Sequence, residues 1–195
     1  FVMQRIPDSE LIINPDGSVY HISLKPEHVA KNVIVVGDPG RVKIVSAQFD
    51  EILYQIENRE FVTHTGMYNG EKITVCATGI GTDNIDIVLN ELDAAVNIDL
   101  ETKVVKENHT TLNIVRIGTS GALHESIPVD SFLISKKAMG FDGLLHFYQD
   151  PKNALEKEIT DAFCKHANWN DQLAKPYVVS ASEELFDKLK DGCIP

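Results

Sequence analysis

The chain has 195 residues, of which 43% are hydrophobic and 24% are charged, the profile of a globular protein with a sizeable core. With 29 acidic against 18 basic residues, its net charge of −11 argues against a nucleic-acid-binding surface, which needs a clustered basic face. The three cysteines are widely spaced and include no C-x-x-C pair, which fits a reducing compartment better than a disulfide framework. No apolar run approaches the roughly 18 residues of a membrane span. We therefore expect a single domain over residues 1–195, cytoplasmic, that binds neither nucleic acid nor membrane.

Residues 1–20 predict a polar arm, because Asn14-Pro15-Asp16-Gly17 is a strong turn signal. The arm ends at Tyr20-His21. From composition alone, His21 would be an ordinary solvated histidine.

The first glycine turn follows Val33–Val36, a continuous apolar run that predicts a buried parallel strand. The run leads into Gly37-Asp38-Pro39-Gly40-Arg41, and the apolar spacing of 42–49 predicts a short helix. Glycines allow close approach of a ligand, and backbone N–H groups beside a guanidinium favour an anion such as phosphate. The alternative is an ordinary strand–loop–helix connection with a solvated arginine.

A β-hairpin is predicted next. Glu51–Ile56, Glu60–Thr65 and Lys72–Ala77 are strand-like, and Asn69-Gly70 suits a type I′ turn between the last two.

A second glycine loop, Thr78–Asn84, precedes a helix whose apolar residues fall on one face, with Thr82 or Asp83 as the expected cap. The loop resembles half of G-x-G-x-x-G, but Asn84 stands where the third glycine belongs. This argues against a dinucleotide site.

The third glycine turn, Gly118-Thr119-Ser120-Gly121, follows the predicted strand Leu112–Ile117, which carries Arg116. Val129–Ile134 reads as a further strand. Farther along, Asp150-Pro151 predicts a helix start, Tyr177–Ser180 a strand, and Ser182 the cap of a helix to about Leu189. Alternating strands and helices indicate an α/β sandwich with a mixed central sheet.

Ligands of open α/β sheets bind beyond the carboxyl ends of strands. If the strands before the first and third turns are neighbours, Arg41, Arg116 and Thr119 converge on one site suited to a phosphate dianion. The alternatives are a structural ion pair for Arg116, and hydroxyls of Thr119 and Ser120 that satisfy their own backbone.

Four motifs occur in an order and spacing that resemble the nucleoside phosphorylase family, most closely its uridine phosphorylase branch. They are Gly37-Asp38-Pro39-Gly40-Arg41, Arg59-Glu60-Phe61, Thr78-Gly79-Ile80-Gly81 and Arg116-Ile117-Gly118-Thr119-Ser120-Gly121. The resemblance implies a three-layer α/β/α sandwich with a mixed central sheet.

It also implies phosphorolysis: inorganic phosphate, a co-substrate rather than a cofactor, attacks ribose C1′ of uridine and releases uracil and ribose 1-phosphate. No side chain is expected as a catalytic base, because a phosphate dianion needs no deprotonation. Three alternatives stay open: a purine nucleoside phosphorylase, a nucleosidase of the same fold that uses water, and a non-catalytic nucleoside- or phosphate-binding module.

Residue by residue, the resemblance assigns phosphate binding to Gly37, Arg41, Arg59, Arg116 and Thr119. Arg59 would serve the neighbouring subunit of a homodimer, the building block of a homohexamer. Without the resemblance, Arg59 would pair with Glu57 or Glu60.

The resemblance assigns nucleoside binding to His21, Ser120 and Gly121, with His21 crossing the dimer interface to the ribose 5′-hydroxyl. Glu60 and Ile80 resemble residues of an interfacial monovalent-cation site for potassium, where Asn84 departs from a serine.

Family members continue with a Gln…Arg pair that reads uracil and a Glu-Met-Glu segment that binds the ribose hydroxyls. Neither occurs before Pro195. We therefore expect the C-terminal part of the fold to be missing from this chain, and base specificity is not readable from it. Phe186 resembles a base-stacking aromatic, but its helical context favours a core position.

Overall fold

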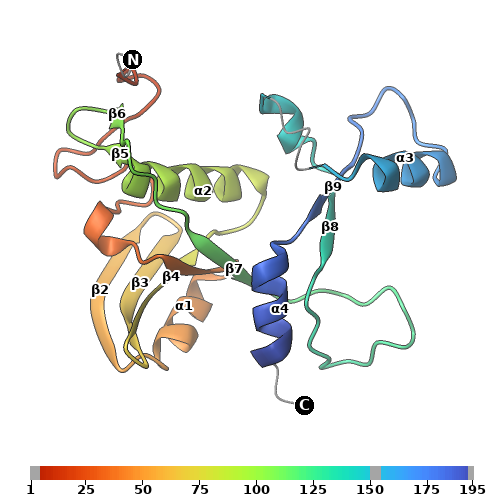
Figure 1. Ribbon diagram of the computed structural model, residues 1–195, viewed down its shortest axis with the longest axis horizontal. Helices are drawn as coiled ribbons and strands as arrows, with labels where there is room; N and C mark the ends of the chain where they lie inside the picture. Colours follow the sequence, from red (N-terminus) through yellow and green to blue (C-terminus); the bar gives the residue numbers. More distant parts are fainter. Residues whose placement is uncertain (1–4, 150–154, 193–195) are drawn as a thin grey trace. The chain divides into compact units, whose positions relative to one another are not determined.

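The computed structural model describes residues 5–149 and 155–192 (Figure 1). The chain divides into two compact units, Phe1–Ser120 and Gly121–Pro195, which are described separately.

The first unit holds most of the strands. Its elements in chain order are η1 (Pro26–His28), β1 (Asn32–Val36), α1 (Pro39–Ser46), β2 (Glu51–Asn58), β3 (Phe61–Tyr68), β4 (Glu71–Ala77), α2 (Thr82–Asn97), β5 (Ile98–Asp99), β6 (Val104–Val105) and β7 (Asn113–Ile117).

Five of these strands form one mixed sheet in the order β2-β3-β4-β1-β7. The central strand β1 runs parallel to both β4 and β7, while β2, β3 and β4 form an antiparallel meander. The strands before the first and third glycine turns are therefore neighbours, because β1 and β7 pair directly.

Helices cover both faces of this sheet. Successive side chains of a strand point to opposite faces, so Val35 packs with Val88 and Leu92 of α2, while Val36 packs with Val42 of α1. Figure 1 shows α1 and α2 on opposite sides of the sheet. The first unit is thus a three-layer α/β/α arrangement with a mixed central sheet.

The hairpin expected from Asn69-Gly70 is confirmed, because β3 and β4 pair antiparallel on either side of it. Asn69 and Gly70 both have positive φ, 49° and 81°, as a type I′ turn requires. The expected cap of α2 is wrong: the N-cap is Gly81, with φ of 95° and no side-chain capping bond, so neither Thr82 nor Asp83 occupies that position.

The second unit contains β8 (Lys137–Gly140), η2 (Leu144–Phe147), α3 (Lys157–His166), β9 (Tyr177–Ser180) and α4 (Glu183–Gly192). Strands β8 and β9 pair antiparallel. Ser182 Oγ accepts a hydrogen bond from the backbone N–H of Leu185, as expected for the residue that starts α4. Phe186 is half-buried on α4, and Lys136 Nζ lies 5.8 Å from its ring centre.

The strand expected at Val129–Ile134 is wrong. These residues form a turn and irregular chain, and Val129 and Phe132 are 91% and 98% exposed. An apolar run becomes a strand only where a neighbouring strand pairs with it, and within the described residues β9 pairs with β8 instead. The expected helix start at Asp150-Pro151 lies outside the described residues.

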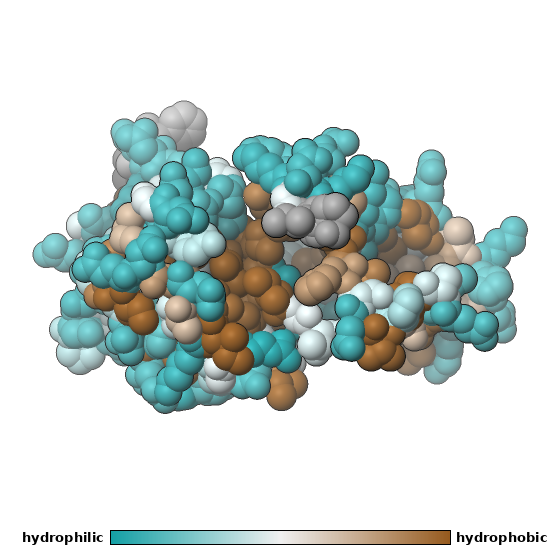
Figure 2. All heavy atoms as spheres, turned by 90° about the horizontal axis from the view of Figure 1, so that it is seen from below, coloured by the Kyte–Doolittle hydropathy of each residue, from teal (hydrophilic) through white to brown (hydrophobic). Residues whose placement is uncertain are grey.

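Apolar side chains reach the surface among a majority of hydrophilic ones on the face drawn in Figure 2. None of the helices in the described part of the chain has the length and apolarity that a membrane span requires.

Candidate active site

The carboxyl ends of three parallel strands meet at one edge of the sheet. Strand β1 ends before Gly37, β4 before Thr78 and β7 before Gly118. Thr78 N–H donates to the Val36 carbonyl at 2.8 Å, which ties the turn after β4 to the end of β1. A Cβ added to Gly37 would lie 3.7 Å from the Gly79 carbonyl oxygen, so these turns are in close contact.

The guanidinium of Arg116 lies against two of these turns. Its Nη2 is 4.0 Å from the position that a Cβ of Gly37 would take. A Cβ on Gly118 would overlap Nη1 of the same guanidinium. Glycine at position 118 therefore leaves the space that Arg116 occupies.

Arg41 is held at the same edge by α1, four residues after Gly37. The helix begins at Pro39, and Asp38 caps it by accepting from Gly40 N–H at 2.8 Å. One N–H of this helix start is therefore already used by Asp38. An anion at this edge would depend on the guanidinium groups rather than on a free helix terminus.

Neither the Arg41 nor the Arg116 guanidinium has an ion-pair or hydrogen-bond partner among residues 5–149 and 155–192. The alternative of a structural ion pair for Arg116 is therefore not what the structure shows. The hydroxyls of Thr119 and Ser120 likewise make no hydrogen bond within these residues. Two guanidinium groups and two hydroxyls are left available at one edge of the sheet, the kind of donor set that binds an oxyanion.

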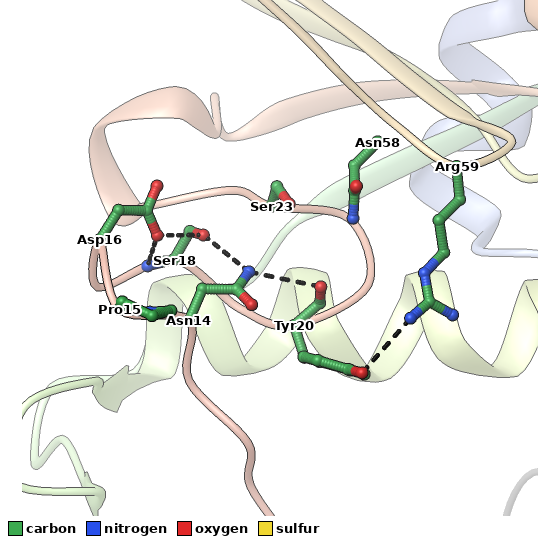
Figure 3. A pocket seen from close by; sticks show the side chains of 8 residues that line it. All are labelled: Asn14, Pro15, Asp16, Ser18, Tyr20, Ser23, Asn58 and Arg59. Atoms are coloured by element: carbon green, nitrogen blue, oxygen red, sulfur yellow. Dashed lines mark hydrogen bonds between the residues drawn. The ribbon is translucent and has the colours of Figure 1, made fainter.

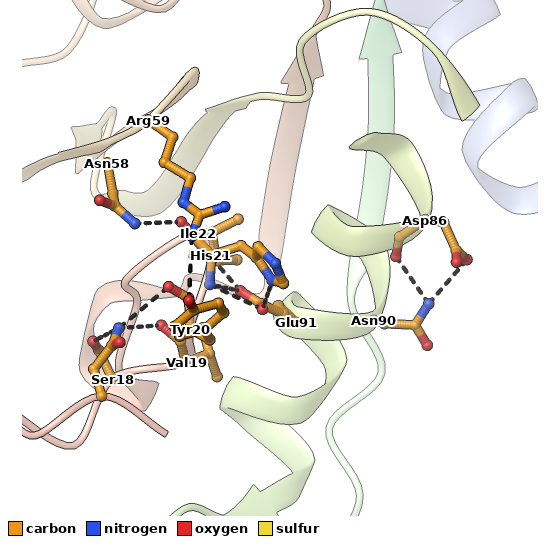
Figure 4. A network of polar contacts seen from close by, with 11 residues as sticks. Ser18, Val19, Tyr20, His21, Ile22, Asn58, Arg59, Asp86, Asn90 and Glu91 are labelled. Atoms are coloured by element: carbon orange, nitrogen blue, oxygen red, sulfur yellow. Dashed lines mark hydrogen bonds and ion pairs between the residues drawn. The ribbon is translucent and has the colours of Figure 1, made fainter. Parts of the chain in front are cut away.

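His21 is not a solvated histidine. Its Nδ1 lies 2.6 Å from Oε1 of Glu91 on α2, and its backbone N–H donates to the same carboxylate at 2.9 Å from Oε2 (Figure 4). Asn58 Nδ2 donates to the His21 carbonyl at 2.8 Å. The His21 side chain is 30% exposed. A helix and a hairpin thus hold His21 through both its ring and its backbone.

Arg59 lies next to this histidine. Its guanidinium is 5.2 Å from the ring centre of Tyr20, and Nη2 donates to the Tyr20 hydroxyl at 3.4 Å. The Tyr20 and His21 rings meet edge to face, 4.8 Å apart. Arg59 therefore stacks on the arm instead of pairing with Glu57 or Glu60, and the two residues that the sequence assigns to a neighbouring subunit form one cluster.

The side chains of Tyr20, Asn58 and Arg59 line a pocket of about 440 Å³ (Figure 3). Its other walls come from the arm, including the Asn14–Ser18 turn. Neither Arg41 nor Arg116 lines it, so this pocket is separate from the strand-end edge.

Glu60 and Ile80, the two residues that the resemblance assigns to a monovalent cation, lie on neighbouring loops. Glu60 Cγ lies 3.5 Å from the position of a Cβ on Gly79, so the two loops are neighbours. The Ile80 carbonyl accepts a hydrogen bond from Asn84 Nδ2 at 3.3 Å.

Sequence reasoning missed Glu91 and Asn58. Glu91 is 70 residues from His21, and nothing in the pattern of α2 marks it apart from the other carboxylates of that helix. Gly121 begins the second unit, so its position relative to the other assigned residues is not described.

Comparison with known proteins identifies the family of this chain. Residues 31–193 match the family model of the phosphorylase superfamily. The chain is 35% identical over 143 residues to a uridine phosphorylase of Thermococcus kodakarensis, covering 73% of this chain and 45% of that protein. It is 33% identical over 175 residues to a uridine phosphorylase of Haemophilus influenzae, covering 86% and 62%. A DeoD-type purine nucleoside phosphorylase of Listeria welshimeri is 30% identical over 120 residues, covering 60% and 46%.

Among solved structures, a Trypanosoma brucei nucleoside phosphorylase that shows uridine phosphorylase activity superposes with a TM-score of 0.78 at 29% identity, over 93% of this chain and 61% of that one. The expected nucleoside phosphorylase-like fold is therefore confirmed. The chain spans about half the length of the curated relatives it matches, between 45% and 62%. The match to the family model covers most of the chain, and the chain therefore belongs to the phosphorylase superfamily.

Proposed function

We propose that the whole protein is a uridine phosphorylase, a pentosyltransferase that converts uridine and phosphate into uracil and ribose 1-phosphate in cytoplasmic nucleoside salvage and catabolism. One observation carries the proposal: the Arg116 guanidinium, without a carboxylate partner in the described residues, lies against the glycine turns that end β1 and β7. The net charge of −11 argues against a general basic surface, so an unpaired arginine guanidinium at a strand-end edge supports a local anion site. The similarity to two uridine phosphorylases supports the same reading.

The chemistry follows from charge. Phosphate bound through Gly37, Arg41, Arg116 and Thr119 forms a bond to C1′ as the bond from C1′ to the base nitrogen breaks. The bonding electrons leave with the uracil ring, which takes a proton from solvent. Because positive charge develops on the ribose ring, the dianion held beside it is both nucleophile and compensating charge. No protein base is required, and Ser120 and Gly121 are proposed to line the nucleoside side of the site.

The active assembly in this proposal is a homodimer, three of which build a homohexamer. His21 would reach the ribose 5′-hydroxyl and Arg59 the phosphate of the neighbouring subunit. Both side chains contact Tyr20 within one subunit, which supports the proposal that His21 and Arg59 enter the neighbouring subunit's site together.

A purine nucleoside phosphorylase is the second candidate, favoured by the similarity to the Listeria enzyme over 60% of this chain. A nucleosidase would have no use for a phosphate-binding pair of arginines, and a binding module would release no base.

One assay separates these outcomes. The full-length protein is incubated with uridine, inosine or adenosine, with and without phosphate, and free base is measured. Phosphate-dependent release of uracil supports the proposal. Phosphate-dependent release of hypoxanthine or adenine alone supports a purine enzyme, release without phosphate supports a nucleosidase, and no release supports a binding module.

A further inference from the structure

The carboxylate of Glu91 is the centre of the contacts around His21. Oε1 lies 2.6 Å from the His21 Nδ1, and Oε2 accepts from the backbone N–H groups of His21 at 2.9 Å and Ile22 at 2.8 Å (Figure 4). The Glu91 side chain is only 13% exposed. One carboxylate on α2 therefore holds the histidine ring and the two backbone amides at the end of the arm.

The direction of the ring hydrogen bond determines the chemistry of the other nitrogen. A carboxylate only accepts hydrogen bonds, so Nδ1 must carry the hydrogen. In the neutral ring Nε2 then has a lone pair and is an acceptor. The His21 side chain is 30% exposed, so it remains accessible to a ligand.

We propose that Glu91 is the positioning residue for His21: it fixes the Nδ1–H tautomer and the orientation of the ring, and so makes Nε2 the hydrogen-bond acceptor for the 5′-hydroxyl of a nucleoside. Asn58 assists by holding the His21 carbonyl. This inference rests on the proposed function for the identity of the ligand, but the contact between Glu91 and His21 can be tested without it.

The kinetic test compares uridine with 5′-deoxyuridine, which lacks the hydroxyl, in the full-length protein at saturating phosphate. Glu91→Gln keeps the shape but weakens the acceptor, and we expect it to raise KM for uridine about tenfold, the scale of one charge-assisted hydrogen bond. We expect KM for 5′-deoxyuridine to change by less than about twofold, because no hydrogen bond to Nε2 exists to be lost. Glu91→Asp, which keeps the charge, should recover part of the uridine KM.

Asp93→Asn is the matched control, since Asp93 lies on the same helix and accepts from Asn97 Nδ2 at 2.7 Å. It removes the same charge from α2 and should change neither KM. Equal effects of Glu91→Gln on both nucleosides, or no effect on either, would overturn the proposal.

The second readout needs no activity. Nitrogen-15 NMR of the imidazole rings, with His21→Ala to assign the signal, should show the Nδ1–H tautomer in the parent protein and its loss in Glu91→Gln. A parent ring protonated on Nε2 alone would overturn the inference whatever the kinetics show. If the parent releases no base but shows the Nδ1–H ring, the proposed function fails while the positioning of His21 by Glu91 stands.

Discussion

Arg116 on β7 stands beside Val35 on β1, and each is two residues before the glycine that follows its strand. Because the two strands are parallel and paired in this register, Gly37 and Gly118 leave the sheet at the same level. A single arginine can therefore reach both turns, and the phosphate contacts proposed above depend on that register.

Arg116→Ala is expected to raise KM for phosphate by about 10- to 100-fold, because a hydrogen bond to a charged group contributes about 1.5–3 kcal/mol. KM for the nucleoside should change less, since the side chain is assigned to phosphate. Thr119→Val should have a smaller effect than Arg116→Ala or Arg41→Ala, because it removes a neutral donor. The measurement is initial rate against phosphate concentration, with Arg5→Ala as control, whose guanidinium pairs with exposed Asp8. Unchanged phosphate saturation in Arg116→Ala would remove Arg116 from the site.

Gly118→Ala tests the space beneath the guanidinium. The added methyl group would overlap Arg116 Nη1, and the exposed side chain can move away at little cost. We expect the free energy of unfolding to change by less than about 1 kcal/mol. Phosphate KM should rise about tenfold, the equivalent of about 1.4 kcal/mol. Urea unfolding and phosphate saturation together check this, and a large loss of stability with normal phosphate binding would contradict it.

Mixing two impaired variants, assayed at a phosphate concentration well below the KM of Arg116→Ala, tests the donation of His21 across a dimer. An Arg116→Ala subunit has a defective site of its own but can still supply His21 to its partner. When it pairs with a His21→Ala subunit, one of the two sites is complete. Random pairing should then restore about a quarter of the sites of a two-fold symmetric dimer. The check is activity after co-refolding the two variants, against each variant refolded alone. Recovery no greater than the sum of the separate activities would argue that His21 acts within its own subunit.

Stability should fall as the solution is acidified, before the carboxylates titrate. Burial lowers the pKa of His64, whose Nδ1 lies 2.7 Å from Ser46 Oγ, and the nearby Lys43 lowers it further. In the unfolded chain the pKa returns to about 6.5, so below that pH the unfolded state binds the extra proton and the free energy of unfolding decreases. Burial also lowers the pKa of His28, which adds an effect of the same sign.

Urea unfolding between about pH 7.5 and pH 5.5 should therefore give a falling free energy of unfolding. His64→Gln should show a shallower slope than the parent protein. Slopes are compared rather than absolute stabilities, because the substitution also changes packing. Equal slopes would exclude His64 as a source of the pH dependence.

The sequence was most informative where the determinants are local. Asn69-Gly70 predicts its turn because a type I′ turn needs positive φ at both central residues, which favours Asn followed by Gly. The apolar run Val33–Val36 predicts a strand buried on both faces. The segment Val129–Ile134 has a similar apolar pattern, but pairing depends on a distant strand, so the pattern alone misled. Motif order placed Arg116 correctly at a strand end.

Other features depend on contacts between distant segments and could not be read from the chain. Glu91 meets His21 across 70 residues, and α2 offers several carboxylates of similar appearance. Gly81 rather than Thr82 caps α2, because the positive φ of the glycine determines where the helix begins. The stacking of Arg59 on Tyr20 likewise joins a hairpin to the arm.

The anchoring of His21 at its ring, its N–H and its carbonyl has a consequence for assembly. The end of the arm is bonded to α2 and β2 of its own subunit, so the entropy of ordering it is lost when that subunit folds. An encounter between two subunits would then join surfaces that are already formed, with little rearrangement on binding. Association should accordingly resemble rigid-body docking rather than the coupled folding of a loose tail.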